Sequence, residues 1–274
     1  MMDWNRQPLT IRLNSARDTE TCAAALSILA LDESRHVRTL VASNYSTPTQ
    51  SLDALAQDAS GLVRRSVGLN PKTLASTLGT LSNDESTDVR SFVAGNISCP
   101  TDILVKLSTD FEPVRSNVAA NPNCPISLLQ ILSSDGSSNV RGSVAINQNA
   151  PVELLTLLAK DKNSDVRGCV PSNRNCPLAV KILLLVDHDD DVRNEVKDQL
   201  DVSDRTFWIK AVEEKISLDM SVDKRSIGRS LGDSLLSAGF IDIYQALQSV
   251  ELELKLNQHQ QETIQSPTKN NFRL

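Results

Sequence analysis

The chain has 274 residues and a net charge of −6, and 40% of its residues are hydrophobic but only 3% aromatic. This length fits one or two domains, and the acidic balance disfavours whole-surface binding of nucleic acid or anionic membranes. The longest apolar run, 178–186, contains Lys181 and is too short to span a membrane. The first residues lack the apolar core of a signal peptide, and five cysteines without one indicate reduced thiols. We therefore expect a cytoplasmic protein.

Along the chain, the first feature is a Val-Arg dipeptide that recurs at nearly constant spacing. The copies begin at Val37, Val63, Val89, Val114, Val140, Val166 and Val192. The steps are 26 residues, with one step of 25, and Ile11-Arg12 is a degenerate first copy. Counted from each Val, another Val follows at +4, Asn at +7, Pro often at +11, Leu at +18 and Asp at +21. So many coincident columns predict an array of supersecondary units.

Each repeat is expected to form two short helices joined by tight turns. The first helix opens near the Pro, as in 151–158, where apolar residues have helical spacing. The second helix carries Val-Arg-x-x-Val-Ala-x-Asn and buries both valines on one face. Serines three before the Val are expected to cap it: Ser34, Ser60, Ser86 and Ser137. Neither helix can bury its apolar stripe alone, so neighbouring repeats must stack into one core.

Beyond residue 200 the repeat register fails. A helix beginning near Asp204 carries Phe207 and Trp208, which we interpret as a C-terminal cap. Two more helices are expected on either side of Gly239, and Ile243, Leu247, Val250 and Leu254 share one face of the second. The polar end of the chain is expected to be a disordered tail. The predicted organisation is a repeat array over 1–200, a helical cap over 201–257 and a tail over 258–274.

The repeat pattern resembles the variant leucine-rich repeat family, which is similar in style to HEAT repeats. The resemblance covers about Ile11 to Leu200 and implies an all-α, right-handed superhelical solenoid in which α and 3-10 helices alternate. It also implies a binding scaffold rather than an enzyme. One family member carries an N-terminal cysteine cluster for an iron–sulfur centre. Here only Cys22 precedes residue 99, so no cofactor is expected.

The Arg column has two interpretations: a cationic track for phosphates, or a structural ladder. Each Arg has an Asp available either five residues before its Val or in an adjacent repeat. Because an equal set of carboxylates accompanies the arginines, and partly buried charges are paired, we favour the ladder. Its members are Arg38, Arg64, Arg90, Arg115, Arg141, Arg167 and Arg193, with Asp58, Asp84, Asp110, Asp135 and Asp161.

The Asn column is interpreted as a second structural series. Asparagine tolerates left-handed φ angles and bonds to the backbone of its own turn, so the column is expected to stabilise turns rather than carry chemistry. Its members are Asn44, Asn70, Asn96, Asn121, Asn147 and Asn173.

Metal binding and catalysis find little support. Cys99, Cys124 and Cys176 occupy one column, but equivalent positions in stacked helices lie ~10 Å apart, too far to share a zinc ion. We interpret them as small buried hydrophobes. The run 187–191 has the opening carboxylates of a calcium loop, but Val192 stands where that loop needs Gly. Catalytic motifs are absent, so we predict no metal, no cofactor and no enzymatic activity.

The positions −1, +2 and +6 around each Val vary while the packing columns repeat. By analogy with HEAT solenoids they should line the concave face, unless they form an unused solvated surface. They contain one Arg, no Lys and no aromatic residue, which disfavours nucleic acid. The candidate partner-binding residues are Leu62, Arg65, Leu69, Ser91, Ser116, Asp165, Asp191 and Asp198. The favoured function is a scaffold for an unknown protein partner. The alternatives are an assembly subunit that self-associates through 222–257 and, third, a nucleic-acid-acting solenoid enzyme.

Overall fold

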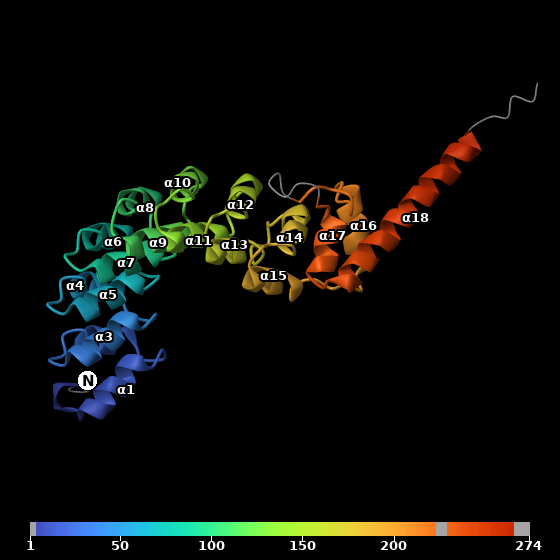
Figure 1. Ribbon diagram of the computed structural model, residues 1–274. Helices are drawn as coiled ribbons and strands as arrows, with labels where there is room; N and C mark the ends of the chain where they lie inside the picture. Colours follow the sequence, from blue (N-terminus) through green and yellow to red (C-terminus); the bar gives the residue numbers. More distant parts are fainter. Residues whose placement is uncertain (1–3, 223–228, 266–274) are drawn as a thin grey trace, which may run out of the picture. The chain divides into compact units, whose positions relative to one another are not determined.

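The computed structural model describes residues 4–222 and 229–265, and there it contains 18 α-helices, one 3-10 helix at Trp4–Arg6 and no named strand (Figure 1). An isolated bridge joins Ser221 and Ser230. The chain forms two compact units. The first comprises 1–158 with 173–175, and the second comprises 159–172 with 176–274. The expected all-α helical repeat class is confirmed, although the division falls within the repeats rather than at residue 200.

The first unit is built from two layers of helices. The inner helices are α1 (Leu9–Arg17), α3 (Arg35–Ser43), α5 (Gly61–Leu69), α7 (Thr87–Gly95), α9 (Glu112–Ala120) and α11 (Ser138–Ile146). The outer helices are α2 (Ala23–Leu29), α4 (Thr49–Leu55), α6 (Ala75–Leu81), α8 (Thr101–Leu107), α10 (Ile126–Leu132) and α12 (Val152–Leu158). Each inner helix packs on the next inner helix, and the inner layer follows the inside of this unit's curve (Figure 1).

The two apolar columns of each repeat explain these layers. Val63 and Val67 of α5 have no exposed surface, and neither has Leu78 of outer helix α6. Burying a Val or Leu side chain contributes about 1.5–3 kcal/mol, so each repeat gains most of its stability from its neighbours. The core of the first unit therefore runs between the layers as a continuous row of valines, leucines and alanines.

The outer helices are α-helices of seven residues, whereas the family resemblance implies 3-10 helices. Their ends explain the difference. The Ala56 N–H donates to Leu52 O at 2.9 Å, an α-type bond, while the Gln57 and Asp58 N–H groups donate three residues back. The 3-10 type of bond is thus found at the two ends of the helix, since the N–H of Ser51 also donates three residues back, to Pro48 O. At the last turn these bonds satisfy carbonyls that the helix would otherwise leave free.

The second unit contains α13 (Ser164–Cys169), α14 (Leu178–Leu184), α15 (Asp190–Lys197), α16 (Arg205–Glu213), α17 (Leu231–Ser237) and α18 (Ile241–Gln265). α13 packs on α15 as in the repeats of the first unit, and α16 and α17 pack on α18. Gly239 has a φ of 81° in the turn between α17 and α18, a conformation that favours glycine.

Helix α18 extends further than the sequence pattern predicts. Ile243, Leu247 and Val250 are buried as expected, and the helix then continues to Gln265. The stretch 258–265, assigned to a disordered tail, is therefore helical, and 266–274 lie outside the described residues. No helix in the described part of the chain combines the length and apolar character needed to cross a membrane.

Candidate functional site

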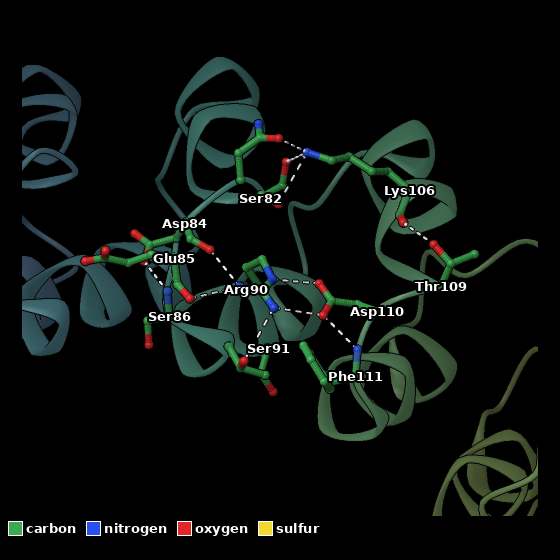
Figure 2. Close-up of polar contacts among 12 residues, drawn as sticks. Ser82, Asp84, Glu85, Ser86, Arg90, Ser91, Lys106, Thr109, Asp110 and Phe111 are labelled. Atoms are coloured by element: carbon green, nitrogen blue, oxygen red, sulfur yellow. Dashed lines mark hydrogen bonds and ion pairs between the residues drawn. The ribbon is translucent and has the colours of Figure 1, made fainter.

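The Arg column ties each repeat to the next, as Figure 2 shows for Arg90. Nε and Nη2 of Arg90 donate to the two carboxylate oxygens of Asp110 at 2.6 and 2.9 Å. Nη1 donates to the backbone carbonyl of Asp84 at 2.7 Å. Asp110 also accepts the N–H of Phe111 at 2.7 Å. One guanidinium thus joins the backbone of its own repeat to the carboxylate of the following repeat.

The same arrangement recurs along the chain. Within the first unit the carboxylate partners are Arg12–Asp32, Arg38–Asp58, Arg64–Asp84 and Arg115–Asp135, and within the second unit they are Arg167–Asp187. Nη1 of Arg141 donates to the carbonyl of Asp135 at 2.8 Å, and Asp161 accepts the N–H of Asn163. Of the two pairings left open by the sequence, the structure uses the adjacent repeat for the carboxylate and the same repeat for a backbone carbonyl.

Arg64 shows how fully a ladder arginine inside the array is bonded, whereas Nε of Arg12, in the first repeat, has no partner. Nε, Nη1 and Nη2 of Arg64 all donate hydrogen bonds, to Asp84, Asp58 and Glu85 among others. Arg64 lines an open groove of about 580 Å³ together with both aspartates, yet its donors point to protein acceptors. The hydrogen bond from Arg90 lowers the pKa of Asp110. The geometry is that of a structural ladder, not of a row of phosphate-binding cations.

The Asn column forms a second ladder, and it is fully buried. Nδ2 of Asn121 donates to Ala94 O at 2.6 Å and to Asn96 O at 2.9 Å, both in the preceding repeat. Its Oδ1 accepts the N–H of Asn123 at 2.8 Å within its own turn. Equivalent bonds are made by Asn44, Asn70, Asn96, Asn147 and Asn173.

Two expectations about these turns need correction. The asparagines are not left-handed, since Asn44 has φ −78° and Asn121 φ −65°. The side chain bonds its own turn through Oδ1 only, and Nδ2 reaches two carbonyls of the preceding repeat, one of which also accepts a backbone N–H of its own turn, as Asn96 O does from Cys99. The constant spacing of about 26 residues could have suggested these bonds between repeats, since an Asn that recurs in every repeat is expected to contact the same atoms of each neighbouring repeat.

A third series was missed by the sequence analysis. The residue two positions after the Asn is Ser or Asn in every repeat but that of Lys72, and this side chain donates to the backbone of the preceding turn. Asn123 Nδ2 donates to Ile97 O at 2.7 Å, Asn149 Nδ2 to Pro122 O at 2.5 Å, and Ser98 Oγ to Pro71 O at 2.7 Å. The mixture of Ser and Asn in this column concealed a shared role, because both can donate to a carbonyl.

Most of the serines that were predicted to cap the inner helices do not cap them with their side chains. Ser34, Ser60 and Ser86 precede the inner helices, but their side chains make no capping bond. Instead, their N–H groups donate to the ladder aspartates two residues earlier, as in Ser86 to Asp84 at 2.9 Å. Ser137 alone of the four accepts a helix N–H through its side chain. The aspartate, held by an arginine, fixes the turn that the serine was expected to fix.

The three cysteines of one column are separately buried beside backbone. Cys99, Cys124 and Cys176 have 1%, 2% and 9% of their surface exposed. Burial raises the pKa of Cys124 to about 11. Within the described residues, no group of three or more metal-ligating side chains comes together. In the run 187–191, Asp187 pairs with Arg167, and Asp189 accepts the N–H groups of Asp191 and Val192 at the start of α15.

The candidate partner-binding residues of the first unit fall into two groups. Leu62 and Leu69 of α5 are 45% and 50% exposed on the inner layer. Arg65, between them, is half-buried, and its guanidinium lies 5.0 Å from the centre of the Phe92 ring. Ser91 is 8% exposed and accepts from Asn117, and Ser116 bonds to Ser143. The +2 column is therefore partly occupied by packing, unlike the −1 and +6 columns.

The acidic candidates belong to the second unit. Asp165 lies on α13, Asp191 on α15 and Asp198 just after α15, and all three are exposed. Their neighbour Asp190 pairs with Arg193 on the same helix. The structure thus places the apolar and acidic halves of the predicted strip in different compact units, and each is considered by itself.

No family model and no curated protein matches the chain. Among solved structures, the chain is similar to one described as a leucine-rich repeat variant with a novel repetitive protein structural motif. The sequence identity is 24%, the match covers 70% of this chain and 81% of that chain, and the TM-score is 0.47. The assignment of this chain as an all-α helical repeat protein rests on its own helices and ladders.

Proposed function

We propose that the protein is a non-catalytic scaffold whose first unit binds a protein segment on its inner layer. One observation carries this proposal: the side chains that hold the repeats together and the side chains that are exposed stand at different positions of each inner helix. The N–H groups of the Arg and Asn side chains are bonded within their own repeat and to neighbouring repeats. The side chains at −1 and +6, by contrast, are exposed in every repeat and differ between repeats. Exposed side chains that have no packing role are free to specify a partner.

The chemistry of that surface favours a protein over other ligands. Leu62, Leu69 and Ile146 are each 45–50% exposed on the inner helices, and Arg65 stands between the two leucines of α5. Arginine is enriched in protein-binding hot spots, and the exposed leucines beside it supply apolar surface that a partner can bury. The arginine is already placed by Phe92, so it would lose little conformational freedom on binding.

A site-specific photo-crosslinker tests the site. Placed at position 69 it should capture a partner from the native host, and placed at Leu157, which is 54% exposed on outer helix α12, it should not. With that partner purified, Leu69→Asp should raise the dissociation rate by about tenfold or more, as loss of a hot-spot side chain does. Equal capture at both positions, or unchanged dissociation of Leu69→Asp, would locate binding elsewhere.

For the second unit, we propose that Asp165, Asp191 and Asp198 attract a basic segment of a partner. The support is their exposure, because exposed charges act mainly on association rates. Asp165→Lys with Asp191→Lys should slow association several-fold and reduce its salt dependence, whereas Asp242→Lys on α18 should change neither. Identical kinetics for all three proteins would remove this role.

Self-association is the second candidate function, and α18 provides the observation that favours it. Leu252 and Leu256 are 57% and 62% exposed, one helical turn apart on a helix of 25 residues. Two such leucines can pair with the same residues of a second copy. Light scattering should then show a dimer that Leu252→Glu with Leu256→Glu converts to monomer. A monomeric wild-type protein would exclude this candidate.

A further inference from the structure

The turns that follow the inner helices of the first unit carry a row of apolar side chains, which we call the turn-edge row. It consists of Tyr45, Pro71, Ile97 and Pro122, one from each of four consecutive repeats, each directly after the ladder asparagine. Tyr45 and Ile97 are 59% and 62% exposed, Pro122 is exposed and Pro71 half-buried. Because the intervening asparagine is buried, the row projects outward from the edge of the unit, apart from the inner-layer residues Leu62 and Arg65.

Hydrogen bonds from the next repeat hold the backbone of three of the four row residues. The carbonyls of Pro71, Ile97 and Pro122 each accept a bond from the side chain two residues after the asparagine of the next repeat. The asparagines bond the same turns from the other side, as Asn121 does to Asn96 O. A surface ordered before binding loses little entropy when a partner arrives. The row is therefore a rigid template rather than a set of independent exposed residues.

The turns that carry the row contain no carboxylate side chains. The five-residue turns from 43–47 to 146–150 contain no aspartate or glutamate, although the protein as a whole is acidic. The turn before them differs, because it holds the exposed carboxylates of Asp18 and Glu20 and adjoins the turn of Tyr45, where Ser46 donates to Thr19 O. Lys72 follows Pro71 and is exposed, and Arg174 occupies the equivalent of the row position at the far end of this unit. A partner that lies along the row therefore meets cations beyond Tyr45 and carboxylates before it, so its own carboxylates should lie at the end away from Tyr45.

The spacing of the row specifies the conformation of that partner. Packed helices lie about 8–10 Å apart, so successive row residues are separated by roughly that distance. Three residues of a polyproline II segment, at about 3.1 Å each, span ~9 Å. A side chain at every third residue of such a segment would meet each repeat in turn. Extended proline-rich segments bind aromatic side chains, and Tyr45 supplies an exposed ring at one end of the row.

We infer that the turn-edge row is a docking site for an acidic polyproline II segment with apolar residues at every third position. The probe is a fluorescein-labelled peptide with leucine at every third position, proline pairs between the leucines and two glutamates at one end. Fluorescence anisotropy with the full-length protein should show saturable binding. A control peptide of the same composition with irregular leucine spacing should bind about tenfold more weakly.

Variants make the test specific to the row. Ile97→Asp should weaken binding of the regular peptide by about tenfold or more. Ile131→Asp, the same change at a 69% exposed site on outer helix α10, should leave binding unchanged. Circular dichroism checks that both variants fold. Equal affinity for the two peptides, or wild-type affinity of Ile97→Asp, would overturn the inference. So would a dimer of the wild-type protein that Ile97→Asp dissociates, since the row would then bind a second copy.

Discussion

The two units of the chain use the same repeat but finish it differently. In the first unit the five ladder arginines from Arg12 to Arg115 each pair with an aspartate 20 residues later, as Arg90 pairs with Asp110. In the second unit Arg167 still pairs with Asp187, but Arg193 pairs with Asp190 on its own helix. Position 213, where the next partner would stand, is an exposed glutamate of α16. The ladder arginine therefore pairs with a buried aspartate only where another repeat follows. Where none follows, the arginine pairs with an exposed carboxylate on its own helix.

Other residues provide the packing where the ladder stops. Trp208 of α16 is 1% exposed and donates from its indole nitrogen to Val202 O at 3.1 Å. Phe207 meets it edge to face, with ring centres 4.8 Å apart. Glu251 of α18 is 7% exposed and accepts the N–H of Leu218. Each of these contacts occurs once. The second unit is therefore stabilised by individual residues, whereas the first unit is stabilised by equivalent residues that recur in every repeat. The predictions below test that contrast.

The largest effect is expected in the middle of the Asn ladder. Asn121→Ala removes two bonds to the preceding repeat and one within its own turn. It leaves the carbonyl of Ala94 without this donor, while Asn96 O keeps the N–H of Cys99. At about 1–3 kcal/mol for each unsatisfied buried group, the free energy of unfolding should fall by roughly 3–5 kcal/mol. Asn123→Ala, which loses exposed bonds in the same turn, should cost under about 1 kcal/mol. Urea unfolding measures both, and similar losses would mean that the buried amide is not special.

The Arg ladder should show the contrast between the units most directly. Arg115→Ala leaves Asp135, whose side chain is 10% exposed, without its bidentate partner, and should destabilise the first unit by about 2–4 kcal/mol. Arg193→Ala removes a pair whose carboxylate is 79% exposed and should cost under about 1 kcal/mol. Thermal and urea unfolding of the two variants provide the comparison. Equal destabilisation would contradict the idea that the ladder works through the next repeat.

Much of this architecture is predictable from the sequence because the repeat makes each inference several times over. The valine columns, the burial of the Cys column and the charge pairing follow from the repeated pattern and the residue types. The burial of the Asn column was not predicted, since turn residues are usually exposed. The direction of the Arg–Asp pairing does not follow either, because an aspartate stands both before each Arg, as Asp58 does six residues before Arg64, and 20 residues after it, as Asp84 does in the next repeat. The role of Ser98 and Asn123 was hidden because different residue types share it. Helix α18 was predicted too short, because its polar end has no repeated apolar positions. Ser91 of the +2 column was predicted to be exposed but is buried, because it bonds to Asn117, a contact that the repeat pattern does not show.

Acid should weaken the first unit through its aspartates. The hydrogen bonds from Arg90 and Arg115 lower the pKa values of Asp110 and Asp135 in the folded state. A carboxyl with a lowered folded pKa stabilises the fold above its unfolded pKa of about 4 and loses that contribution as the pH falls through the folded value. The melting temperature should therefore be level near neutrality and fall below about pH 4. Asp110→Asn should melt lower than wild type at neutral pH, and the gap should narrow in acid. A constant gap would assign the loss to other groups.

The smallest effect, on local opening rather than on stability, concerns one buried thiol in each unit. Cys124 lies in the first unit with 2% of its surface exposed, and Cys176 lies in the second with 9% exposed. Burial raises the pKa of both thiols to about 11, so neither should react with a disulfide reagent at neutral pH without local opening. The comparison uses variants that keep either Cys124 or Cys176 as the single cysteine of the five. Cys176 should be labelled several-fold faster, because the ladder beside it ends within its own unit and local opening costs least where neighbours are fewest. The exposed Cys22, kept alone, gives the rate of a thiol that needs no opening. Faster labelling of Cys124 would show that the regular repeats, and not the end of the ladder, open first.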